Sequence, residues 1–262
     1  TTALIDTGCG RDVIEAVQAK YRIDLVINSH AHPDHSAGNW LLPQARLSVP
    51  QEGAASAGRR PLLADRFAEP GPLAKSWQEF ATTLMGFQDR PPTEVFADGH
   101  VFDFGQIQLR AVHTPGHTSD HYCLFESRQG LLLSFDIELT PYGPWYGHRE
   151  SDIGQFRASL DLIRDLDPRL VAPSHQGPIS RDIRAKLDRY EAVFERRQAK
   201  ILNLIRKGAT LEELVKISPI YGSYPFAPDL LGYWEGMMIE KHLAELEAQG
   251  LVRGEGQVYW PL

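Results

Sequence analysis

The segment His30-Ala-His-Pro-Asp-His35 decides how this chain is interpreted, because it places three imidazoles and one carboxylate within a single turn-sized stretch. Imidazole nitrogen and carboxylate oxygen are the donors that a borderline divalent cation prefers. The segment follows Ile23–Asn28, a short and mostly apolar run that predicts a buried strand. The cluster therefore stands at the carboxyl end of a strand, where α/β proteins place their chemistry.

One such segment can serve two neighbouring metal ions. Along an extended backbone, His30 and His32 point to the same side. Pro33 then predicts the start of a helix, so that Asp34 and His35 aim at a point a few ångströms away. This geometry assigns the first pair to one metal and the second pair to another. The alternative is an accidental histidine-rich loop.

Length and composition bound the class of protein. A chain of 262 residues fits one large domain, or one domain with a small appendage, and its 42% hydrophobic and 23% charged residues are typical of a globular protein. No apolar run approaches the length of about 18 residues that a membrane span requires. The net charge of −7 argues against a strong nucleic-acid binder. Two cysteines form no disulfide framework, and buried free thiols at Cys9 and Cys123 point to a cytoplasmic protein.

The first half of the chain reads as strands and helices interrupted by one segment of different texture. Thr2–Asp6 predicts a strand with no lead-in, so we expect N-terminal strands that precede this sequence. The next predicted elements are a helix at Asp12–Tyr21 and a strand at Arg46–Val49. Residues 51–94 are rich in Ala, Gly, Pro and charge, and read as an insertion with a helix at Lys75–Met85. This insertion is either a lid or interaction surface, or a plain surface excursion.

From residue 101 the pattern predicts an ordered core and then a helical end. The core elements are two hairpins, a helix and a short strand: Val101–Phe104 with Ile107–Val112, His121–Glu126 with Leu131–Phe135, Ile153–Leu166, and Leu170–Ala172. From residue 181 the predicted elements are three helices and a hairpin: Arg184–Lys207, Leu211–Ile217 after an N-cap at Thr210, Leu230–Gln249, and Leu251–Trp260. This last order is that of a winged helix.

Three further sites supply the same kinds of donor where predicted strands end. They are His117 in His113-Thr-Pro-Gly-His-Thr, Asp136 after Leu131–Phe135, and His175 in Pro173-Ser-His-Gln. With Leu4-Ile-Asp-Thr-Gly8 and the opening segment, these elements resemble the metallo-β-lactamase superfamily in their order, and they span most of residues 3 to 175. The full set is most similar to the glyoxalase II, lactonase and nuclease branches.

The resemblance implies a fold, a domain division and a set of metal ligands. The fold is α/β, a four-layer αββα sandwich in residues 1–180, followed by a small winged-helix-like helical domain in residues 181–262. By match to the family motifs, His30, His32 and His117 hold the first of two divalent metals. Asp34, His35 and His175 hold the second, and Asp136 bridges the two.

Neighbouring residues are expected to support this centre. Asp6 and Asp120 are candidates to orient ligand imidazoles, as outer carboxylates commonly do. For Asp6, a turn-capping role is nearly as good an interpretation. His113 is expected in this outer layer or in plain packing rather than as a ligand.

The wall of the substrate pocket is expected to differ from that of the relatives. Phe135 stands where these families usually have glycine, and the Ser174 and Gln176 positions also depart from the usual motif. Tyr142, Trp145, Tyr146 and His148 follow the bridging aspartate closely and either line a substrate pocket or form a packed aromatic loop.

The expected activity is that of a dinuclear metal-dependent hydrolase. A metal-bridging hydroxide would attack a small ester-like substrate, a thioester or a lactone, with Asp34 as a candidate proton acceptor. Zinc suits the donors best, although iron and manganese also accept them. The expected partner is a small-molecule substrate, with no membrane and with homodimer formation left open.

Two alternatives stay open at this point. The C-terminal extension resembles that of the LACTB2-like endoribonucleases, which would make single-stranded RNA the substrate. Nucleic-acid binding is not favoured, because the predicted helix at Leu230–Gln249 is rich in glutamate, and acidic side chains repel phosphate. The other alternative is a non-catalytic member that senses a small ligand.

Overall fold

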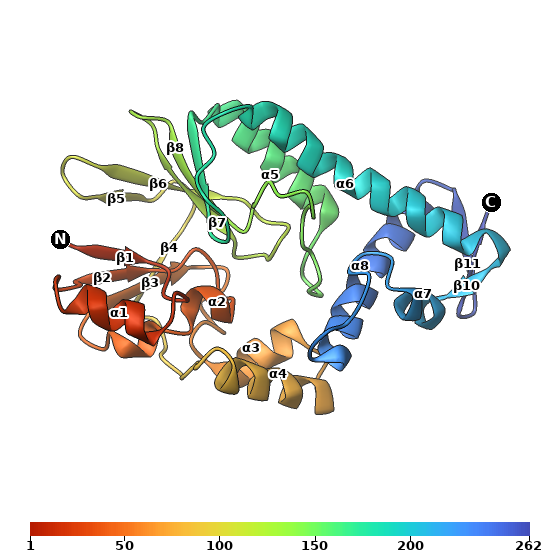
Figure 1. Cartoon of the computed structure of the whole chain (residues 1–262), viewed down its shortest axis with the longest axis horizontal. Coiled ribbons are helices and arrows are strands. Elements are labelled where there is room, and N and C mark those ends of the chain that lie inside the picture. The colour runs from red at the N-terminus through yellow and green to blue at the C-terminus, as the bar shows by residue number, and fades with distance from the viewer.

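The computed structural model describes residues 1–262 and contains two facing β-sheets (Figure 1). The first sheet is parallel throughout. Its strands lie in the order β1 (Ala3–Ile5), β2 (Leu25–Ile27), β3 (Arg46–Pro50) and β4 (Glu94–Phe96). All three residues of β2 are buried, which explains why this strand reads as a continuous apolar run rather than an alternating one.

The second sheet is antiparallel except at one edge, where β8 and β9 are parallel. Its strands lie in the order β5 (Val101–Asp103), β6 (Gln108–His113), β7 (Tyr122–Glu126), β8 (Leu131–Phe135) and β9 (Leu170–Pro173). The predicted hairpins at residues 101–112 and 121–135 are confirmed to within about two residues at each end, the accuracy expected of element boundaries.

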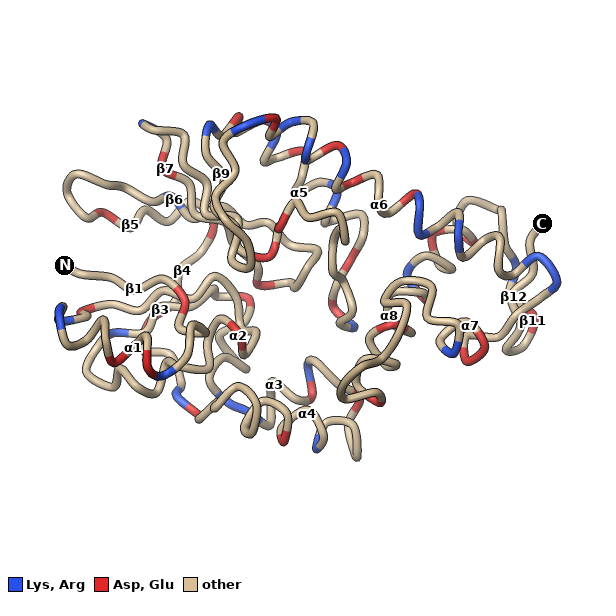
Figure 2. Tube along the Cα trace, viewed as in Figure 1, with Lys and Arg blue, Asp and Glu red and all other residues tan.

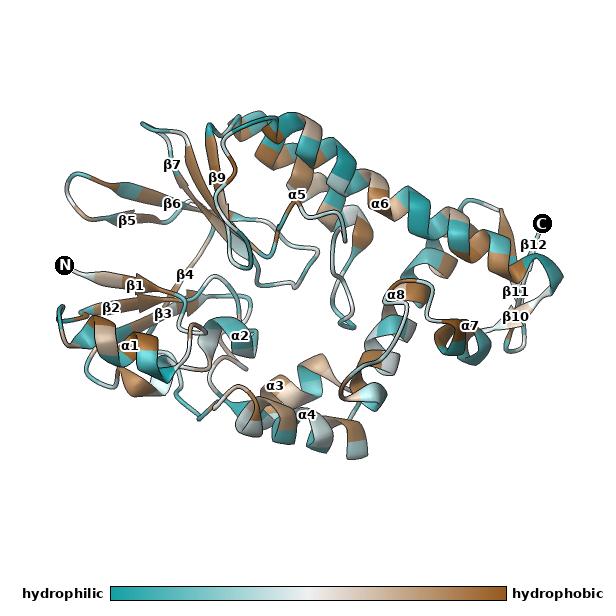
Figure 3. Cartoon of the chain, viewed as in Figure 1, coloured by the Kyte–Doolittle hydropathy of each residue, from teal (hydrophilic) through white to brown (hydrophobic).

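Alternation along the strands builds the layers. Leu25 and Ile27 of β2 join Tyr122 and Leu124 of β7 in one core between the sheets, whereas Val26 packs with the helix side of the first sheet. The strands are accordingly mostly hydrophobic (Figure 3). The first sheet is covered by α1 (Arg11–Gln18) and α2 (Pro33–Ser36), and the second by α5 (Ile153–Leu166) and α6 (Ile183–Leu204). The arrangement is the predicted mixed α/β sandwich.

The segment 51–94 is a packed part of this structure. It forms α3 (Arg60–Phe67) and α4 (Pro72–Thr83), which share a buried cluster that includes Phe67 and Trp77. Only α4 was predicted. Leu230, from the far end of the chain, joins the same cluster, so the segment connects the sandwich to the C-terminal elements. It is therefore more than a plain surface excursion.

The C-terminal elements are three helices and a small three-stranded sheet. After α6 come the 3-10 turn η2 (Ile205–Lys207), β10 (Ala209–Thr210), α7 (Leu211–Ile217), α8 (Pro228–Ala248), β11 (Val252–Glu255) and β12 (Val258–Pro261), with sheet order β10-β12-β11. Thr210 caps α7 through a full capping box with Glu213, as its sequence position predicts. Buried side chains on several sides of α8 fix it against α4, α6 and α7.

One local expectation was wrong, namely the burial of both cysteines. Cys9 is exposed, and only Cys123 is a buried free thiol. Phe135, at the position where a glycine was usual, adopts a φ of 49° and so lies in the left-handed region that favours glycine. No helix combines the length and the apolar character that crossing a membrane would demand.

Candidate metal centre

Two groups of metal-compatible side chains share one carboxylate at an edge of the sandwich. The first cluster is His30, His32, His117 and Asp136, and the second cluster is Asp34, His35, Asp136 and His175. Within each cluster the donor atoms all lie within 4.8 Å of one another. The structure thus brings together all seven residues that the family motifs marked as ligands, and Asp136 is common to both clusters.

The local chain path separates the two clusters. His30 and His32 follow β2, His30 in a bend and His32 in extended backbone, and Pro33 then starts α2 at its first turn. Pro suits this position because the first helical N–H has no intrahelical partner. Asp34 and His35 consequently project from a helix and not from a strand, which turns them toward the second cluster.

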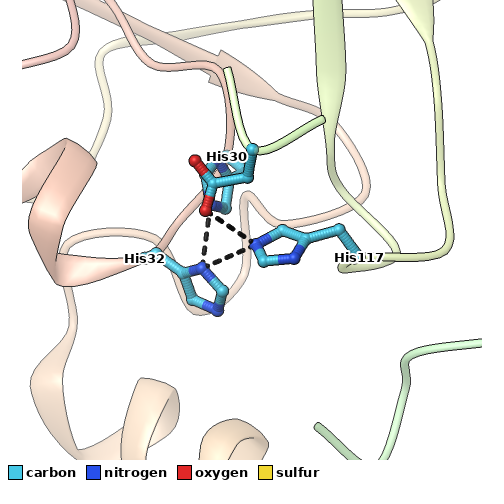
Figure 4. Close-up of side chains that lie close together, drawn as sticks. His30, His32 and His117 are labelled. Carbon is cyan, nitrogen blue, oxygen red and sulfur yellow. Dashed lines mark hydrogen bonds and ion pairs between the residues drawn. The ribbon is translucent and has the colours of Figure 1, made fainter. Parts of the chain in front are cut away.

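In the first cluster three imidazole nitrogens face one another at hydrogen-bond distance. His32 Nδ1 lies 2.9 Å from His30 Nε2 and 3.0 Å from His117 Nε2. The three labelled rings of Figure 4 show this convergence. Asp136 Oδ2 lies 3.1 Å from His117 Nε2. These rings are 0 to 7% exposed as residues, so the nitrogens meet away from bulk water.

The second cluster is more open. His35 Nε2 lies 2.8 Å from Asp136 Oδ1. His175 Nε2 lies 3.4 Å from Asp34 Oδ2 and 3.5 Å from Asp136 Oδ1. The side chain of His175 is 50% exposed and that of Asp34 is 38% exposed. The two clusters are therefore open to solvent on the side of His175 and Asp34.

Asp6 and Ser29 hold the inner imidazole of the second cluster. Asp6 Oδ2 accepts from His35 Nδ1 at 2.8 Å. Asp6 in turn accepts from the backbone N–H and the hydroxyl of Ser29, each at 2.8 Å. With its Nδ1 proton bound to Asp6, His35 turns Nε2 toward the cluster, where this atom would bind a cation on loss of its own proton. This hydrogen bond to His35 is the orienting contact that was expected of Asp6.

Two imidazoles of the first cluster are held by the loop that follows β8. His117 Nδ1 donates to the backbone carbonyl of Trp145 at 2.9 Å. His32 Nε2 lies 3.0 Å from His148 Nδ1. Sequence reasoning placed His148 only among residues of an aromatic loop, because no spacing links it to His32, from which it is 116 residues distant.

The donor set fits a bound cation better than the side chains fit one another. The hydrogen bond of His117 to a carbonyl leaves only a lone pair on its Nε2, and this atom faces His32 Nδ1. In the second cluster, His35 Nε2 and Asp136 Oδ1 are buried. They lie 2.8 Å apart, but this contact lacks the geometry of a hydrogen bond. Buried polar atoms without partners are rare and demand an explanation. Divalent cations bound by these donors would supply the missing partners.

The pKa shifts reflect burial and charge at the two clusters. Burial, with the neighbouring imidazoles, lowers the pKa of His30 and His32 well below the usual value. Burial opposes the charge of His35, but the surrounding carboxylates outweigh it and raise its pKa well above the usual value. Hydrogen bonds to Asp136 and Asp34 raise the pKa of His175 to about 10. His30 and His32 are thus neutral imidazoles, the form that binds metals.

Two expected supporting residues have other roles. Asp120 makes no hydrogen bond to an imidazole. Instead it pairs with Arg66 of α3, whose Nη2 lies 2.5 Å from Asp120 Oδ1 and 2.6 Å from Glu150 Oε1. His113 stacks on Tyr122 at 4.7 Å and donates to the Ser119 carbonyl, so it belongs to plain packing. Sequence could not reveal Arg66, since α3 itself was not predicted.

A cavity of about 370 Å³ opens onto both clusters. Its floor contains the cluster residues His32, Asp34, His117, Asp136 and His175. Its walls come from four separate parts of the chain, namely the α4 region, the loop after β8, helix α6, and the C-terminal segment 221–234. The wall residues are Phe80, Met85, Glu138, Thr140, Tyr142, Trp145, Tyr190, Tyr221, Phe226, Leu231 and Trp234.

The pocket expectations are met only in part. Tyr142 and Trp145 line the cavity. Phe135 does not, because its ring is buried in the core between the two sheets. Tyr146 is also fully buried and bonds through its hydroxyl to His242 Nε2 at 2.7 Å. Glu138 lines the cavity and was not predicted, since a single glutamate after a strand carries no motif.

Comparison with known proteins identifies the family. Residues 1–175 match the Metallo-beta-lactamase superfamily, which is more than half of the chain. The chain belongs to the metallo-β-lactamase superfamily. A metallo-beta-lactamase family protein from Thermus thermophilus shares the fold, with a TM-score of 0.76 and 23% identity over 99% of this chain and 90% of that one.

Two groups of curated relatives are similar in sequence. The Beta-lactamase-like protein 2 homolog of Drosophila melanogaster is 26% identical over 95% of this chain and 80% of its own length. An Atrochrysone carboxyl ACP thioesterase of Aspergillus fumigatus is 26% identical over 76% of this chain. That match spans 54% of the fungal protein, so the chain covers about half of this relative.

Proposed function

We propose that this superfamily member is a dinuclear metal-dependent hydrolase of a small ester-like substrate, and that a thioester with a flat apolar acyl group fits it best. The observation that carries the proposal is the cavity. It opens onto both clusters, and its lining contains aromatic rings and no lysine or arginine. A neutral, apolar acyl group suits such walls, whereas a polyphosphate chain requires cations.

The residues divide the work as follows. Two bound divalent cations would lower the pKa of a shared water and polarise the substrate carbonyl. His30, His32 and His117 hold the first, His35 and His175 the second, and Asp136 reaches both. Asp34 is ionised, with a pKa of about 2 in which the charge of His35 and a hydrogen bond from His175 outweigh burial, and this favours a ligand role over that of a strong base.

Several observations support a thioester over the alternatives. The relatives include proteins named as acyl carrier protein thioesterases. Both Lys or Arg and Asp or Glu occur along α6 and the elements after it (Figure 2), although residues 196–207 carry only basic ones. The order of α6, α7, α8 and the β11–β12 hairpin is compatible with a winged helix, but α8 is buried against its neighbours rather than presented to a nucleic acid. Zinc is the proposed metal because the donors are imidazoles and carboxylates.

The test compares four substrates on one zinc-loaded sample: an aromatic acyl thioester, an acetyl thioester, a lactone and single-stranded RNA. The proposal expects hydrolysis of the aromatic thioester above the others, abolished by Asp136→Asn. In Trp145→Ala the loss of ring contacts, worth about 1 kcal/mol, raises KM for the aromatic thioester about fivefold. Tyr21→Ala removes an aromatic side chain on the surface and serves as the control.

The outcomes discriminate clearly. Cleavage of RNA alone, lost in Asp136→Asn, would replace the thioester with the nuclease activity. Loaded protein that binds the aromatic acid but cleaves none of the four substrates would favour a ligand sensor. Equal rates on the acetyl and aromatic thioesters would refute the role of the aromatic walls.

A further inference from the structure

The loop at residues 141–148 touches two imidazoles of the first cluster. The Trp145 carbonyl accepts from His117 Nδ1 at 2.9 Å, and His148 Nδ1 lies 3.0 Å from His32 Nε2. Both contacts are made on the side of the ring away from the cluster. One short loop therefore contacts two of the three imidazoles of this cluster from behind.

These contacts bear on which nitrogen of each ring carries the proton and which has a lone pair for a cation. A carbonyl can only accept, so His117 keeps its proton on Nδ1 and turns the lone pair of Nε2 to the cluster. His32 faces the cluster with Nδ1 and lies 3.0 Å from His148 Nδ1 through Nε2. With a cation on Nδ1, the proton of this ring would be on Nε2 and would be donated to His148. The loop thus selects the tautomer in which both rings can bind a cation.

The loop is itself held by the C-terminal helices. From α8, Lys241 Nζ donates to the His148 carbonyl at 2.7 Å, and His242 Nε2 lies 2.7 Å from the Tyr146 hydroxyl. From α6, the Arg197 guanidinium donates to the carbonyls of Tyr142, at 2.8 Å, and Pro144. These anchors occur along the whole loop, and they come from residues beyond the part that matches the family.

Packing leaves the loop little freedom to relax. The His148 ring stacks on Phe67 of α3, with centroids 4.2 Å apart and planes 22° apart. At Gly147 an added Cβ would lie 2.6 Å from the Trp145 ring and 2.9 Å from Trp234 Cβ, so no side chain fits there. Rigid support of this kind keeps a ligand oriented before its metal arrives.

The second cluster is supported from a different part of the chain. Its inner imidazole, His35, is held by Asp6 at the end of β1 and through it by Ser29. The side chains of these two residues form no hydrogen bond with the 141–148 loop or the C-terminal helices. A change in the loop should therefore weaken one metal site and spare the other.

We propose that His148 is a positioning residue for His32, and that α6 and α8 hold the first metal site in shape through the 141–148 loop. On this inference the C-terminal helices are an integral support of the metal centre. The inference rests on the proposed metal centre and not on the identity of the substrate, so metal binding tests it whether or not a thioester is hydrolysed.

The experiment measures the two zinc dissociation constants of the full-length metal-free protein by competition with a chromophoric chelator. His148→Leu removes the acceptor for His32 and is expected to raise one dissociation constant about 10- to 100-fold. His148→Asn places an amide oxygen where Nδ1 stood and should restore that constant to near wild type. Asp6→Asn should raise the other dissociation constant.

A second pair of variants tests the helices without altering the loop. Lys241→Met keeps the aliphatic stem but loses the hydrogen bond to the His148 carbonyl. It should raise the same dissociation constant as His148→Leu, by several-fold. Arg149→Met removes a neighbouring exposed cation that has no such bond, and should change neither constant. The inference is overturned if His148→Leu leaves both dissociation constants unchanged or raises them equally, if His148→Asn fails to rescue zinc binding, or if the Lys241 and Arg149 variants behave alike.

Discussion

The buried ion pair between Arg66 and Asp120 offers the sharpest test of how the 51–94 segment is held. Asp120 has a side chain that is 1% exposed, and that of Arg66 is 11% exposed. The guanidinium meets both carboxylate oxygens of Asp120, and a further nitrogen reaches Glu150 at 2.7 Å. Arg66→Met would leave the Asp120 charge buried and uncompensated, which costs about 3–5 kcal/mol of unfolding free energy.

The assay is urea unfolding of wild type, Arg66→Met, Asp120→Asn and the double variant. The double variant should be less destabilised than the sum of the two single changes by about 2 kcal/mol, because no charge is then left without a partner. Arg46→Met is the matched control. Arg46 pairs with Glu94, but its side chain is 58% exposed, so its loss should cost under about 1 kcal/mol.

The pH dependence has a definite sign. Burial would raise the pKa of Asp120, but Arg66 holds it below the usual value. A lowered native pKa stabilises the fold above the unfolded-state pKa, about 3.9, and this stabilisation is lost as the pH falls through the native pKa. Without Arg66, burial raises the pKa of Asp120 above its unfolded-state value. The gap in unfolding free energy between wild type and Arg66→Met should therefore begin to narrow as the pH falls through that raised pKa, and should narrow further below about 4 as wild type loses its own stabilisation. A cost for Arg66→Met no larger than that of Arg46→Met at pH 7 would refute the reasoning.

Three further predictions follow from the centre and the core. Asp136→Asn removes the donor common to both clusters and should reduce the bound zinc to below one ion per chain by elemental analysis; two retained ions would contradict the shared role. Phe135→Gly relieves a left-handed backbone worth about 1 kcal/mol but loses a buried ring worth about 3–5 kcal/mol, so denaturant unfolding should show a net loss, and a gain in stability would reverse this ranking. Zinc at 100 times its dissociation constant should stabilise the chelator-treated protein by about 2.7 kcal/mol, visible as a raised Tm, and no shift would argue against a site formed only in the folded state.

The metal-compatible residues could be predicted because each is carried in a short motif at the end of a strand. His30, His32, Asp34 and His35 are neighbours in the chain, and the backbone geometry of a strand followed by a helix was enough to divide them. The strands of the sandwich were equally accessible, since each is a short apolar run that depends only on local sequence, whereas their layered arrangement came from the resemblance to the family.

The missed features depend on contacts between distant parts of the chain. His148 reaches His32 across 116 residues, and nothing in its own neighbourhood marks it. Helix α3 escaped notice because Leu63, Ala64 and Phe67 are buried among charged and small residues in a segment of loop-like composition. Tyr146 was misjudged for a related reason, because only its hydrogen bond to His242 shows that it faces the core.

Most of the cavity wall comes from segments that contribute no metal donor, namely the α4 region, the 141–148 loop, helix α6 and residues 221–234. Reactivity and selectivity are consequently encoded by separate stretches of sequence. Under the proposed function, exchange of a wall segment such as α4 would redirect the protein to another acyl group while the metal donors stay unchanged. A library confined to Phe80, Met85 and Phe226 would explore substrate range while every donor stays in place.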